Sequence, residues 1–346
     1  MKKVKIGVIG AGGIARRRTI PGMLLANNIE LTAVMDIFKI DEIAAEFGVK
    51  KAYSKVEDIL ADPDVEAVYI ATPASMHREQ IELAAAAGKH ILCEKPLTMT
   101  LADAEAAVAA CKKAGVFLQE GYMMPFHGAH QAIRKAIDEG KIGKIVYMRA
   151  QLSCWYPPIP GAWRQDPAKG GGGSLIDMAT HLYDLLEFFN GPIAKLVAFT
   201  GNLVHDYKSE DSSTTLLQFA NGTQATVDAF FCVPDESTKT RLEIYGSKGA
   251  IFTEGTIGQS QAGTAEIISG LGEAGYDAQQ SKDVARVFAP LEFPQINPYT
   301  AECEYFANCI LNGTAPKVNT GENALRIMDI TAKAYASAKD GQVKNV

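Results

Sequence analysis

The sequence has few cysteines and no long apolar run. Its six cysteines are spread over 346 residues without a Cys-x-x-Cys pair, so we expect reduced thiols in the core rather than a disulfide framework or a zinc site. No apolar segment reaches the roughly 20 residues of a membrane-spanning helix. Only Lys2 and Lys3 precede the first strand-like run, so no secretory leader is expected. These absences predict a cytoplasmic protein without a membrane partner.

Concentrated positive charge is also absent. The formal net charge is -6, whereas a general nucleic-acid binder needs clustered cations to neutralise phosphates. The longest arginine run, Arg16 to Arg18, is too short for that purpose. A length of 346 residues with 47% hydrophobic content predicts two domains, because a single core seldom grows so large.

A nucleotide-binding pattern occupies the amino-terminal segment. The apolar run 4–9 leads into Gly-Ala-Gly-Gly-Ile-Ala at 10–15, as in a strand, a glycine turn and a helix. The glycines permit a tight turn and a close pyrophosphate, and amides at the helix start can hold phosphates. A second apolar run ends at Asp36, an acid that can bind a ribose 2′-hydroxyl. The pattern predicts a dinucleotide site at Gly10, Gly12, Gly13, Ile14 and Asp36, against the alternative of a glycine turn in another α/β protein.

The preference between NAD and NADP depends on the cations near Asp36. Arg16 to Arg18 and Lys39 lie within reach in sequence. They could contact phosphate or form an ordinary solvated helix face. Because no arginine directly follows Asp36, the sequence favours NAD and leaves NADP open.

Residues 1–122 alternate between strand-like and helix-like segments, the pattern of a doubly wound parallel α/β sheet. The expected strands after the first two are 65–71, 90–93 and 116–120, and the expected helices are 43–47, 78–87 and 101–114. We place the domain boundary near Tyr122.

Residues 123–346 predict an α+β domain with a large, mostly antiparallel sheet and helices on one face. Strands are expected at 145–152, 214–219, 223–231 and 241–245, with a hairpin at Asn221-Gly222. Residues 255–287 lack periodicity and are expected to form a long loop. Helices are expected at 127–139, 301–311 and 323–339.

Lys95 follows the strand-like run 90–93 within Glu94-Lys95-Pro96. Ligands of open parallel sheets bind at the carboxyl ends of the strands, so this lysine is a candidate for catalysis. An ordinary surface lysine in a turn is the alternative.

A second constellation begins with four glycines at 170–173, which predict an open approach, followed by Ser174 as a helix cap. Asp177 and His181 are four residues apart, so a helix places them on one face, with Asp184 a turn further. They predict a general acid/base pair, or alternatively a polar helix face. His127 and His130 could join them around a metal ion, but no HExxH or paired-cysteine pattern is present, and we expect no metal.

The glycine turn, Asp36, Glu94-Lys95-Pro96 and the Asp177/His181 pair follow one another as in the glucose-fructose oxidoreductase, inositol dehydrogenase and MocA family. The chain resembles that family over nearly its whole length. The resemblance implies a Rossmann domain followed by an open-faced sheet domain that binds substrate and forms a homodimer or homotetramer. It implies a cis bond before Pro96 and matches the catalytic lysine to Lys95 and the acid/base pair to Asp177 and His181. It places at the cofactor Lys95 and Thr72, Pro73, His77, Glu94, Trp163 and Arg164. Met123-Met124-Pro125-Phe126 departs from the family, which often has an arginine before the aromatic residue. The resemblance therefore does not specify which residues form the entrance to the site.

The expected chemistry is hydride transfer between nicotinamide and a carbinol or ketone carbon of a sugar, cyclitol or related polyol. In this hypothesis His181 takes the hydroxyl proton, Lys95 stabilises the alkoxide, and Asp177 orients His181 and binds a substrate hydroxyl. Further substrate contacts are expected from Tyr122, Trp155, Tyr156, Arg164 and Tyr299, each aromatic having core packing as its alternative. A redox-assisted glycoside hydrolase or epimerase, or a non-catalytic nucleotide sensor, are the other functions considered.

Overall fold

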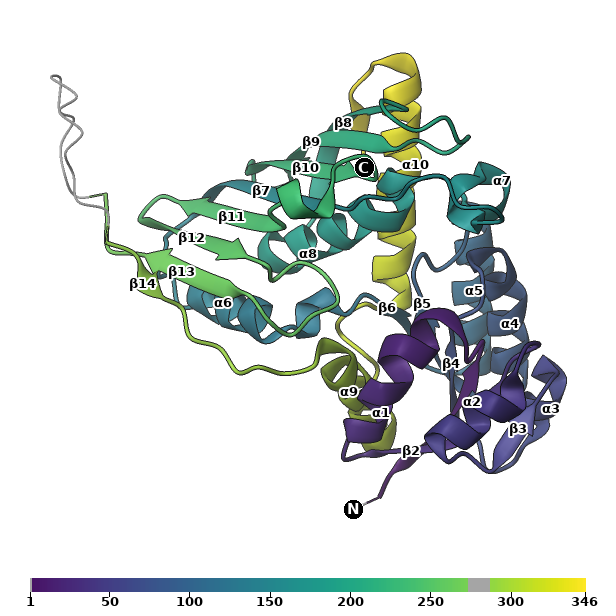
Figure 1. Cartoon of the computed structure of the whole chain (residues 1–346). Coiled ribbons are helices and arrows are strands. Elements are labelled where there is room, and N and C mark those ends of the chain that lie inside the picture. Colours follow the sequence, from purple (N-terminus) through teal and green to yellow (C-terminus); the bar gives the residue numbers. More distant parts are fainter. Residues whose placement is uncertain (1, 273–286) are drawn as a thin grey trace, which may run out of the picture.

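The computed structural model describes residues 2–272 and 287–346, whose strands form two sheets (Figure 1). The first sheet has six strands in the order β3-β2-β1-β4-β5-β6, all parallel. This order confirms the doubly wound prediction. The strands are β1 (Val4–Ile9), β2 (Ile29–Met35), β3 (Lys51–Tyr53), β4 (Ala67–Ile70), β5 (His90–Glu94) and β6 (Leu118–Gly121).

Helices connect these strands and cover both faces of the sheet. They are α1 (Ile20–Leu25), α2 (Ile40–Phe47), α3 (Val56–Ala61), α4 (Ala74–Ala86) and α5 (Leu101–Ala114). A π-helical turn, η1 (Ala15–Thr19), precedes α1. It lies directly before Pro21, whose ring needs extra room and whose nitrogen donates no hydrogen bond, so a wide turn suits this position.

The second sheet has nine strands in the order β14-β13-β12-β11-β7-β10-β9-β8-β15. Its described pairs are antiparallel except for β7 with β10, so the prediction of a mostly antiparallel sheet is confirmed. Asn221-Gly222 forms the expected hairpin, with Gly222 at φ 89°. The strands are β7 (Ile145–Ser153), β8 (Ile193–Gly201), β9 (Ser212–Phe219), β10 (Gln224–Phe230), β11 (Arg241–Gly246), β12 (Gly249–Glu254), β13 (Thr264–Ile268), β14 (Ala289–Pro290) and β15 (Lys344–Asn345).

Helices cover one face of this sheet and leave the other open (Figure 1). Residues of the open face are exposed, including Phe199 at 66% and Leu216 at 50%. Among the described residues, no helix combines the length and apolar character needed to cross a bilayer. The helices of this part are η2 (Met124–Phe126), α6 (Gly128–Asp138), η3 (Trp163–Gln165), α7 (Pro167–Gly170), η4 (Leu175–Ala179), α8 (Thr180–Asn190), η5 (Asp235–Ser237), α9 (Pro298–Asn312) and α10 (Gly321–Asp340).

The last two helices return to the first sheet. α9 contributes Cys303, Phe306 and Ala307 to the core on the α1 side of that sheet. α10 contributes Ala324 and Met328 to the core on the α4 and α5 side. Both faces of the first sheet are therefore completed by the end of the chain, while α10 also packs against β8 and α8 of the second part.

The prediction of a long loop over 255–287 is wrong for part of that range. Residues 264–268 form β13, which pairs antiparallel with β12. This strand is short and has glycine and polar residues before it, so the neighbouring sequence hides its alternation. Residues 273–286 lie outside the described residues.

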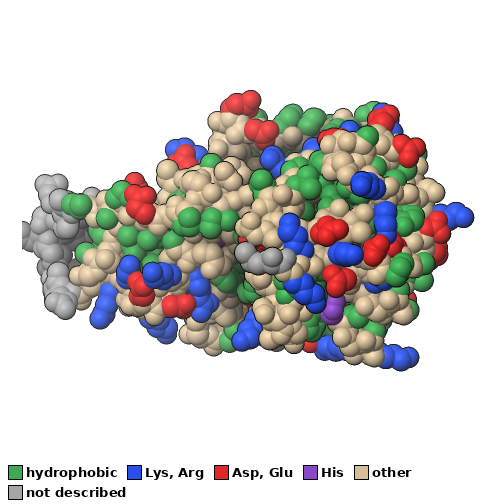
Figure 2. Space-filling view, turned by 90° about the horizontal axis from the view of Figure 1, so that it is seen from below, with side chains coloured by type: hydrophobic (Ala, Val, Ile, Leu, Met, Phe, Trp, Pro, Cys, Tyr) green, Lys and Arg blue, Asp and Glu red, His purple; other side chains and the backbone are tan. Residues whose placement is uncertain are grey.

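The surface mixes charges of both signs. On the face in Figure 2, basic and acidic side chains are interspersed. This arrangement is typical of a solvated protein surface.

Gly10 lies in the turn after β1, where its backbone closely approaches that of Thr72. Its φ is 82°, and an added Cβ would lie 2.8 Å from the Thr72 nitrogen. Gly48 is also left-handed, at φ 66°, but its Cβ would meet nothing within 4 Å. Both alanine variants therefore bear the cost of a left-handed side chain, but only Gly10→Ala must also displace backbone. We expect urea denaturation to show that Gly10→Ala loses about 1–3 kcal/mol more unfolding free energy than Gly48→Ala. Equal losses would contradict the close approach.

Candidate active site

A mostly buried ion-pair cluster joins the segment after β5, at the carboxyl edge of the first sheet, to the helical turn η4. Lys95 directly follows β5, and its side chain is 11% exposed. Its Nζ donates to the Asp177 carboxylate at 2.9 Å and to the Asp177 carbonyl at 2.7 Å. Arg164 Nε donates to the same carboxylate oxygen at 3.0 Å. The structure therefore brings together three of the expected site residues.

A π-helical turn presents Asp177 to the lysine. Asp177 lies in η4, which leads directly into α8. In such a turn residues four apart are no longer aligned as they are in an α-helix, and π-turns are frequent at functional sites. No hydrogen bond joins Asp177 to His181 among the described contacts, and the hydrogen bonds to the Asp177 carboxylate come from Lys95 and Arg164. The expectation that Asp177 directly orients His181 is therefore wrong for this structure.

His181 is buried beside this cluster. The residue is 7% exposed, and its ring packs edge-on against Tyr122 with 5.2 Å between centroids. Nδ1 has no hydrogen-bond partner within the described part of the chain. Burial, reinforced by the nearby Lys95 charge, lowers the pKa of His181 well below its usual value. The imidazole is therefore neutral near pH 7 and able to accept a proton.

Asp177 is held in its charged form, whereas His181 is held neutral. Burial disfavours its charge, but the Lys95 ammonium and the Arg164 guanidinium more than offset this and hold the pKa of Asp177 well below its usual value. The site thus combines a stable carboxylate, two cations and a neutral imidazole.

The turn after β1 has the features needed to hold a dinucleotide. Gly12 donates its amide to Asp36 Oδ2 at 2.9 Å, and Phe38 donates to Oδ1 at 3.0 Å. The Asp36 carboxylate is thereby fixed at the end of β2, directly beside the glycine turn. Gly13 at φ 47° has open space where a Cβ would lie, and Ile14 is half-buried at the start of the helix. These residues fit a ribose and a pyrophosphate.

Two of the three consecutive arginines have protein partners. Arg16 pairs with Glu46, and Arg18 Nε donates to Gln259 at 3.2 Å. Lys39 is exposed and pairs with Glu42. These contacts favour the solvated-face interpretation for Arg16 and Lys39.

The residues expected at the cofactor after β4 differ in how far they are exposed. Pro73 is exposed at the start of α4, and Thr72 is half-buried at the end of β4. His77 is 1% exposed, with Nε2 2.8 Å from the Thr72 carbonyl and Nδ1 3.1 Å from the Pro96 carbonyl. His77 therefore links the loop after β4 to the loop after β5, and its expected place at the cofactor stays a prediction. The Lys95–Pro96 bond is cis, as expected.

Three tyrosines lie near Glu94, which directly precedes Lys95. Glu94 accepts a 2.5 Å hydrogen bond from Tyr69, and burial raises the pKa of Glu94. Tyr122 is 1% exposed and Tyr299 is 3% exposed. Both were expected to touch substrate. Tyr122 packs against His181 and both residues belong to the apolar core, so their burial favours the core-packing alternative.

Aromatic side chains border the open side of the cluster. The Arg164 guanidinium lies 4.2 Å from the centre of the Trp163 ring. Tyr156 is half-buried against Phe231, and the charges of Arg164 and Asp177 act on its hydroxyl. These two aromatic residues remain candidates for substrate contact.

Trp155 faces another part of the protein. Its ring is 41% exposed and packs against His205, with 4.8 Å between centroids. Among the described residues, neither a hydrogen bond nor an aromatic contact joins this side chain to Lys95, Asp177 or His181. Its expected contact with the substrate stays a prediction.

His127 and His130 are buried against each other, 5.0 Å apart. Their ring nitrogens contact the Ala262 and Met124 carbonyls and the Thr256 hydroxyl. Within residues 2–272 and 287–346, no group of three His, Cys, Asp or Glu side chains is arranged to hold a metal ion.

The glycine-rich segment before η4 is closely packed, contrary to the expectation of an open approach. An added Cβ would lie 1.9 Å from Tyr335 Oη at Gly172, and 1.9 Å from the Glu210 carbonyl oxygen at Gly173. Ser174 does not cap the helix, since its buried Oγ has no partner in the described structure.

Glu120 is a site residue that the sequence analysis missed. It is 1% exposed, and its Oε1 accepts the Leu97 amide at 2.7 Å, which fixes the loop that carries Lys95. Burial raises the pKa of Glu120 to about 8. The available signal was an acid at the end of an expected strand adjacent to β5, where Glu120 pairs with Cys93.

Comparison with known proteins gives consistent matches. Residues 4–122 match the model of an oxidoreductase family with an NAD-binding Rossmann fold, and residues 130–252 match the GFO/IDH/MocA C-terminal domain. The chain is 35% identical to a 1,5-anhydro-D-fructose reductase of Ensifer adhaerens over 78% of its own length and 81% of the relative. It is 29% identical to a scyllo-inositol 2-dehydrogenase (NAD(+)) of Bacillus subtilis, over 98% and 95% of the two chains.

Among solved structures, an aldose-aldose oxidoreductase of Caulobacter crescentus complexed with glycerol superposes with a TM-score of 0.88. It is 27% identical in sequence, and the match covers 100% of both chains.

The raised pKa of Glu120 predicts how stability depends on pH. The folded protein keeps this proton up to about pH 8, whereas an unperturbed glutamate loses it near pH 4.5. Between these values the folded state binds more protons, so the unfolding free energy falls as pH rises. We expect Glu120→Gln, which does not titrate, to reduce this fall by on the order of 1 to a few kcal/mol.

Urea denaturation from pH 5 to 8.5 measures this difference. Glu105→Gln, at an exposed position of α5, is the matched control and should follow the wild type. An unchanged pH slope in Glu120→Gln would refute the expected protonation.

Proposed function

The chain belongs to the GFO/IDH/MocA family of NAD-binding oxidoreductases, and from this membership we propose that its substrate is a sugar, cyclitol or related polyol. It is an NAD(P)-dependent dehydrogenase or reductase that acts on a CH–OH or ketone carbon. The observation that carries the proposal is the Lys95–Asp177 pair beside a neutral His181, at the same sheet edge as the glycine turn. The names of two matching relatives, an anhydrofructose reductase and an inositol dehydrogenase, support a polyhydroxylated substrate.

In this proposal the glycine turn and Asp36 would hold the dinucleotide, whose nicotinamide would supply hydride chemistry at the carbinol carbon. His181 accepts the hydroxyl proton in oxidation and returns it in ketone reduction. Its lowered pKa keeps the imidazole unprotonated, so that a ring nitrogen is free for that proton. The ammonium of Lys95 stabilises negative charge on the substrate oxygen, an electrostatic role that burial strengthens.

Asp177 acts in this mechanism by fixing the cations. Its carboxylate anchors both Lys95 and Arg164, so the ammonium is ordered before substrate arrives. A substrate hydroxyl can approach the same carboxylate from its other oxygen, and Arg164, Trp163 and Tyr156 supply polar and stacking surfaces around it. We propose NAD as the preferred cofactor because Asp36 is acidic and fixed beside Gly12.

A substrate panel tests the proposal directly. Absorbance of the reduced nicotinamide is followed with sugars, cyclitols and their keto forms, using NAD and NADP in parallel. We expect net cofactor oxidation or reduction with at least one polyhydroxylated compound, and faster turnover with NAD. Product formation without net cofactor change would indicate a hydrolase or epimerase instead, and cofactor binding without any turnover would indicate a sensor.

Two variants test the residue roles. We expect Lys95→Ala and His181→Ala to lower kcat by about 100-fold or more, because each removes a group that acts on the reacting oxygen or its proton. Cofactor binding, measured by fluorescence titration, should persist in both. Lys113→Ala, at an exposed lysine of α5, is the control and should keep full activity. Retained turnover in both site variants would refute the assignment.

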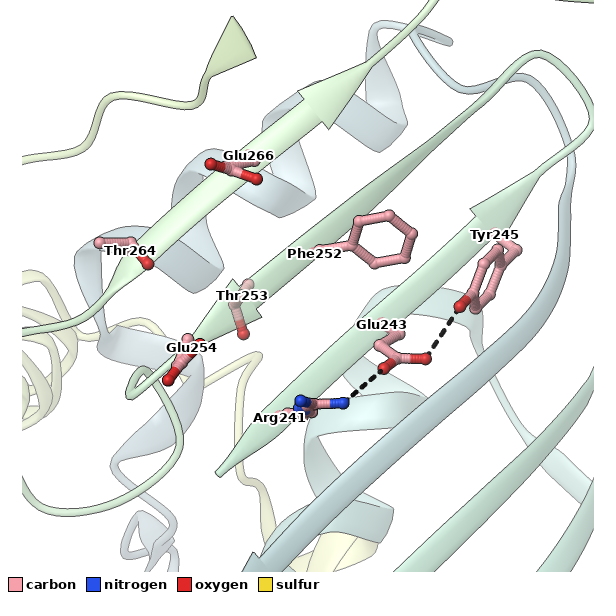
Figure 3. Close-up of a pocket in the computed structure, with 8 residues that line it drawn as sticks. All are labelled: Arg241, Glu243, Tyr245, Phe252, Thr253, Glu254, Thr264 and Glu266. Atoms are coloured by element: carbon pink, nitrogen blue, oxygen red, sulfur yellow. Dashed lines mark hydrogen bonds and ion pairs between the residues drawn. The ribbon is translucent and has the colours of Figure 1, made fainter. Parts of the chain in front are cut away.

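We further propose that the chain forms a homodimer or homotetramer through the open face of the second sheet. Phe199 and Leu216 are exposed on that face. Figure 3 shows a polar hollow on β11 to β13, where Tyr245 donates to Glu243 at 2.9 Å beside Arg241. Apolar and hydrogen-bonding groups on one sheet face are suited to a contact between subunits.

Light scattering after size-exclusion chromatography should give a mass of two or four chains. The double variant Phe199→Asp, Leu216→Asp should shift the mass toward one chain, because it places charge in the contact. The same change at Leu25, which is 66% exposed on α1, should leave the mass unchanged. An oligomer that survives the double variant would point to another surface.

The remaining proposals concern organisation and location. We propose residues 1–122 as the dinucleotide-binding domain and residues 123–346 as the substrate and oligomer domain, with α9 and α10 packed back on the first. We also propose a cytoplasmic location, supported by six unpaired cysteines. Cell fractionation tests that location.

A further inference from the structure

The turn that carries Asp177 has no cap of its own. Ser174, at the N-cap of η4, makes no side-chain capping bond. The first amides of a helix need partners from outside it when they are buried. Residues far along the chain supply these partners.

Glu210 alone holds three successive amides at this helix start. Its Oε1 accepts from Gly173 at 2.9 Å and from Leu175 at 3.0 Å, and its carbonyl accepts from Ser174 at 3.1 Å. A carboxylate at this place also suits the positive end of the helix dipole. Tyr335 of α10 donates to the same Oε1 at 2.8 Å, which fixes the carboxylate in turn.

The glycines before the helix make this contact possible. A side chain at Gly172 would overlap the Tyr335 hydroxyl, and one at Gly173 would overlap the Glu210 carbonyl. The glycine-rich segment therefore allows a close approach between parts of the protein itself.

Backbone hydrogen bonding links this contact to the Lys95–Asp177 ion pair. The Asp177 amide donates to the Gly173 carbonyl at 3.0 Å, so the residue that Glu210 holds also bonds the backbone of Asp177. The Asp177 carbonyl and carboxylate then both accept from Lys95. A displaced first turn would move both acceptors together.

We propose that Glu210 and Tyr335 are positioning residues for Asp177, and that they fix the first turn of its helix so that Asp177 meets Lys95 and Arg164. This inference rests on the proposed function of Asp177. Neither Glu210 nor Tyr335 contacts Lys95 or Arg164 through a hydrogen bond within the described ranges, so both act through the backbone of η4.

Three variants measure this role. Glu210→Ala removes the acceptor, Glu210→Gln keeps an oxygen that can accept the same amides, and Tyr335→Phe removes only the hydroxyl. We expect kcat to fall by about tenfold or more in Glu210→Ala and less in Tyr335→Phe, since small misplacements at a reacting site are costly. Glu210→Gln should recover most of the loss, and the KM for the cofactor should stay unchanged in all three.

Tyr305→Phe is the matched control. The Tyr305 hydroxyl also accepts backbone amides, those of Lys317 at 2.7 Å and Val318 at 3.2 Å, between α9 and α10. Its loss should lower stability to a similar degree as Tyr335→Phe without lowering kcat. A kcat that falls equally in both would overturn the proposal, because it would show a general effect of lost stability.

Hydrogen exchange supplies a readout that does not depend on turnover. Amides of residues 173–177 should exchange faster in Glu210→Ala than in the wild type, and Glu210→Gln should restore protection. Unchanged exchange would show that Glu210 does not hold this turn. Faster exchange with unchanged kcat would overturn the positioning role of Glu210. An inactive wild type would refute the proposed function instead, while the exchange comparison would still decide whether Glu210 holds the turn.

Discussion

A single carboxylate, that of Asp177, lies between two cations that reach it from different parts of the chain. Lys95 comes from the edge of the first sheet and Arg164 from the segment before η4, and both donate to the same oxygen. Because both partners of the Lys95–Asp177 pair are mostly buried, removing either one would leave a poorly solvated charge. This contact therefore fixes the relative position of the glycine turn's sheet and the helix that bears His181.

Other buried acids differ from Asp177 in their electrostatics. Burial is the largest influence on Glu94, Glu120, Asp184 and Glu302, and it raises the pKa of each. Asp177 alone among these five is held well below its usual pKa, since two cations contact it directly. The charges of the two contacting cations, more than hydrogen bonding, keep Asp177 ionised, since Glu94 and Glu120 also accept hydrogen bonds and yet have raised pKa values.

Local patterns in the sequence were sufficient for the strand–turn–helix at 4–25, for Asp36, and for Lys95 at a strand end. In each case the chemistry and its structural context are close together in the chain. Contacts between distant segments were not predictable: Glu210 lies 35 residues from Leu175, and nothing local marks it as a helix cap. The π-turn at Asp177 was not predicted either, because α-helical spacing was assumed. This turn changes which partners the carboxylate binds. Burial of Tyr122, Tyr299 and His77 depends on tertiary packing that residue type does not specify.

The return of α9 and α10 onto the first sheet has a consequence for biogenesis. During synthesis the six parallel strands leave the ribosome early, but apolar surface on both faces of their sheet waits for Phe306, Ala324 and Met328. The amino-terminal half therefore leaves part of its apolar surface uncovered until translation is nearly finished, and uncovered apolar surface of this kind favours aggregation.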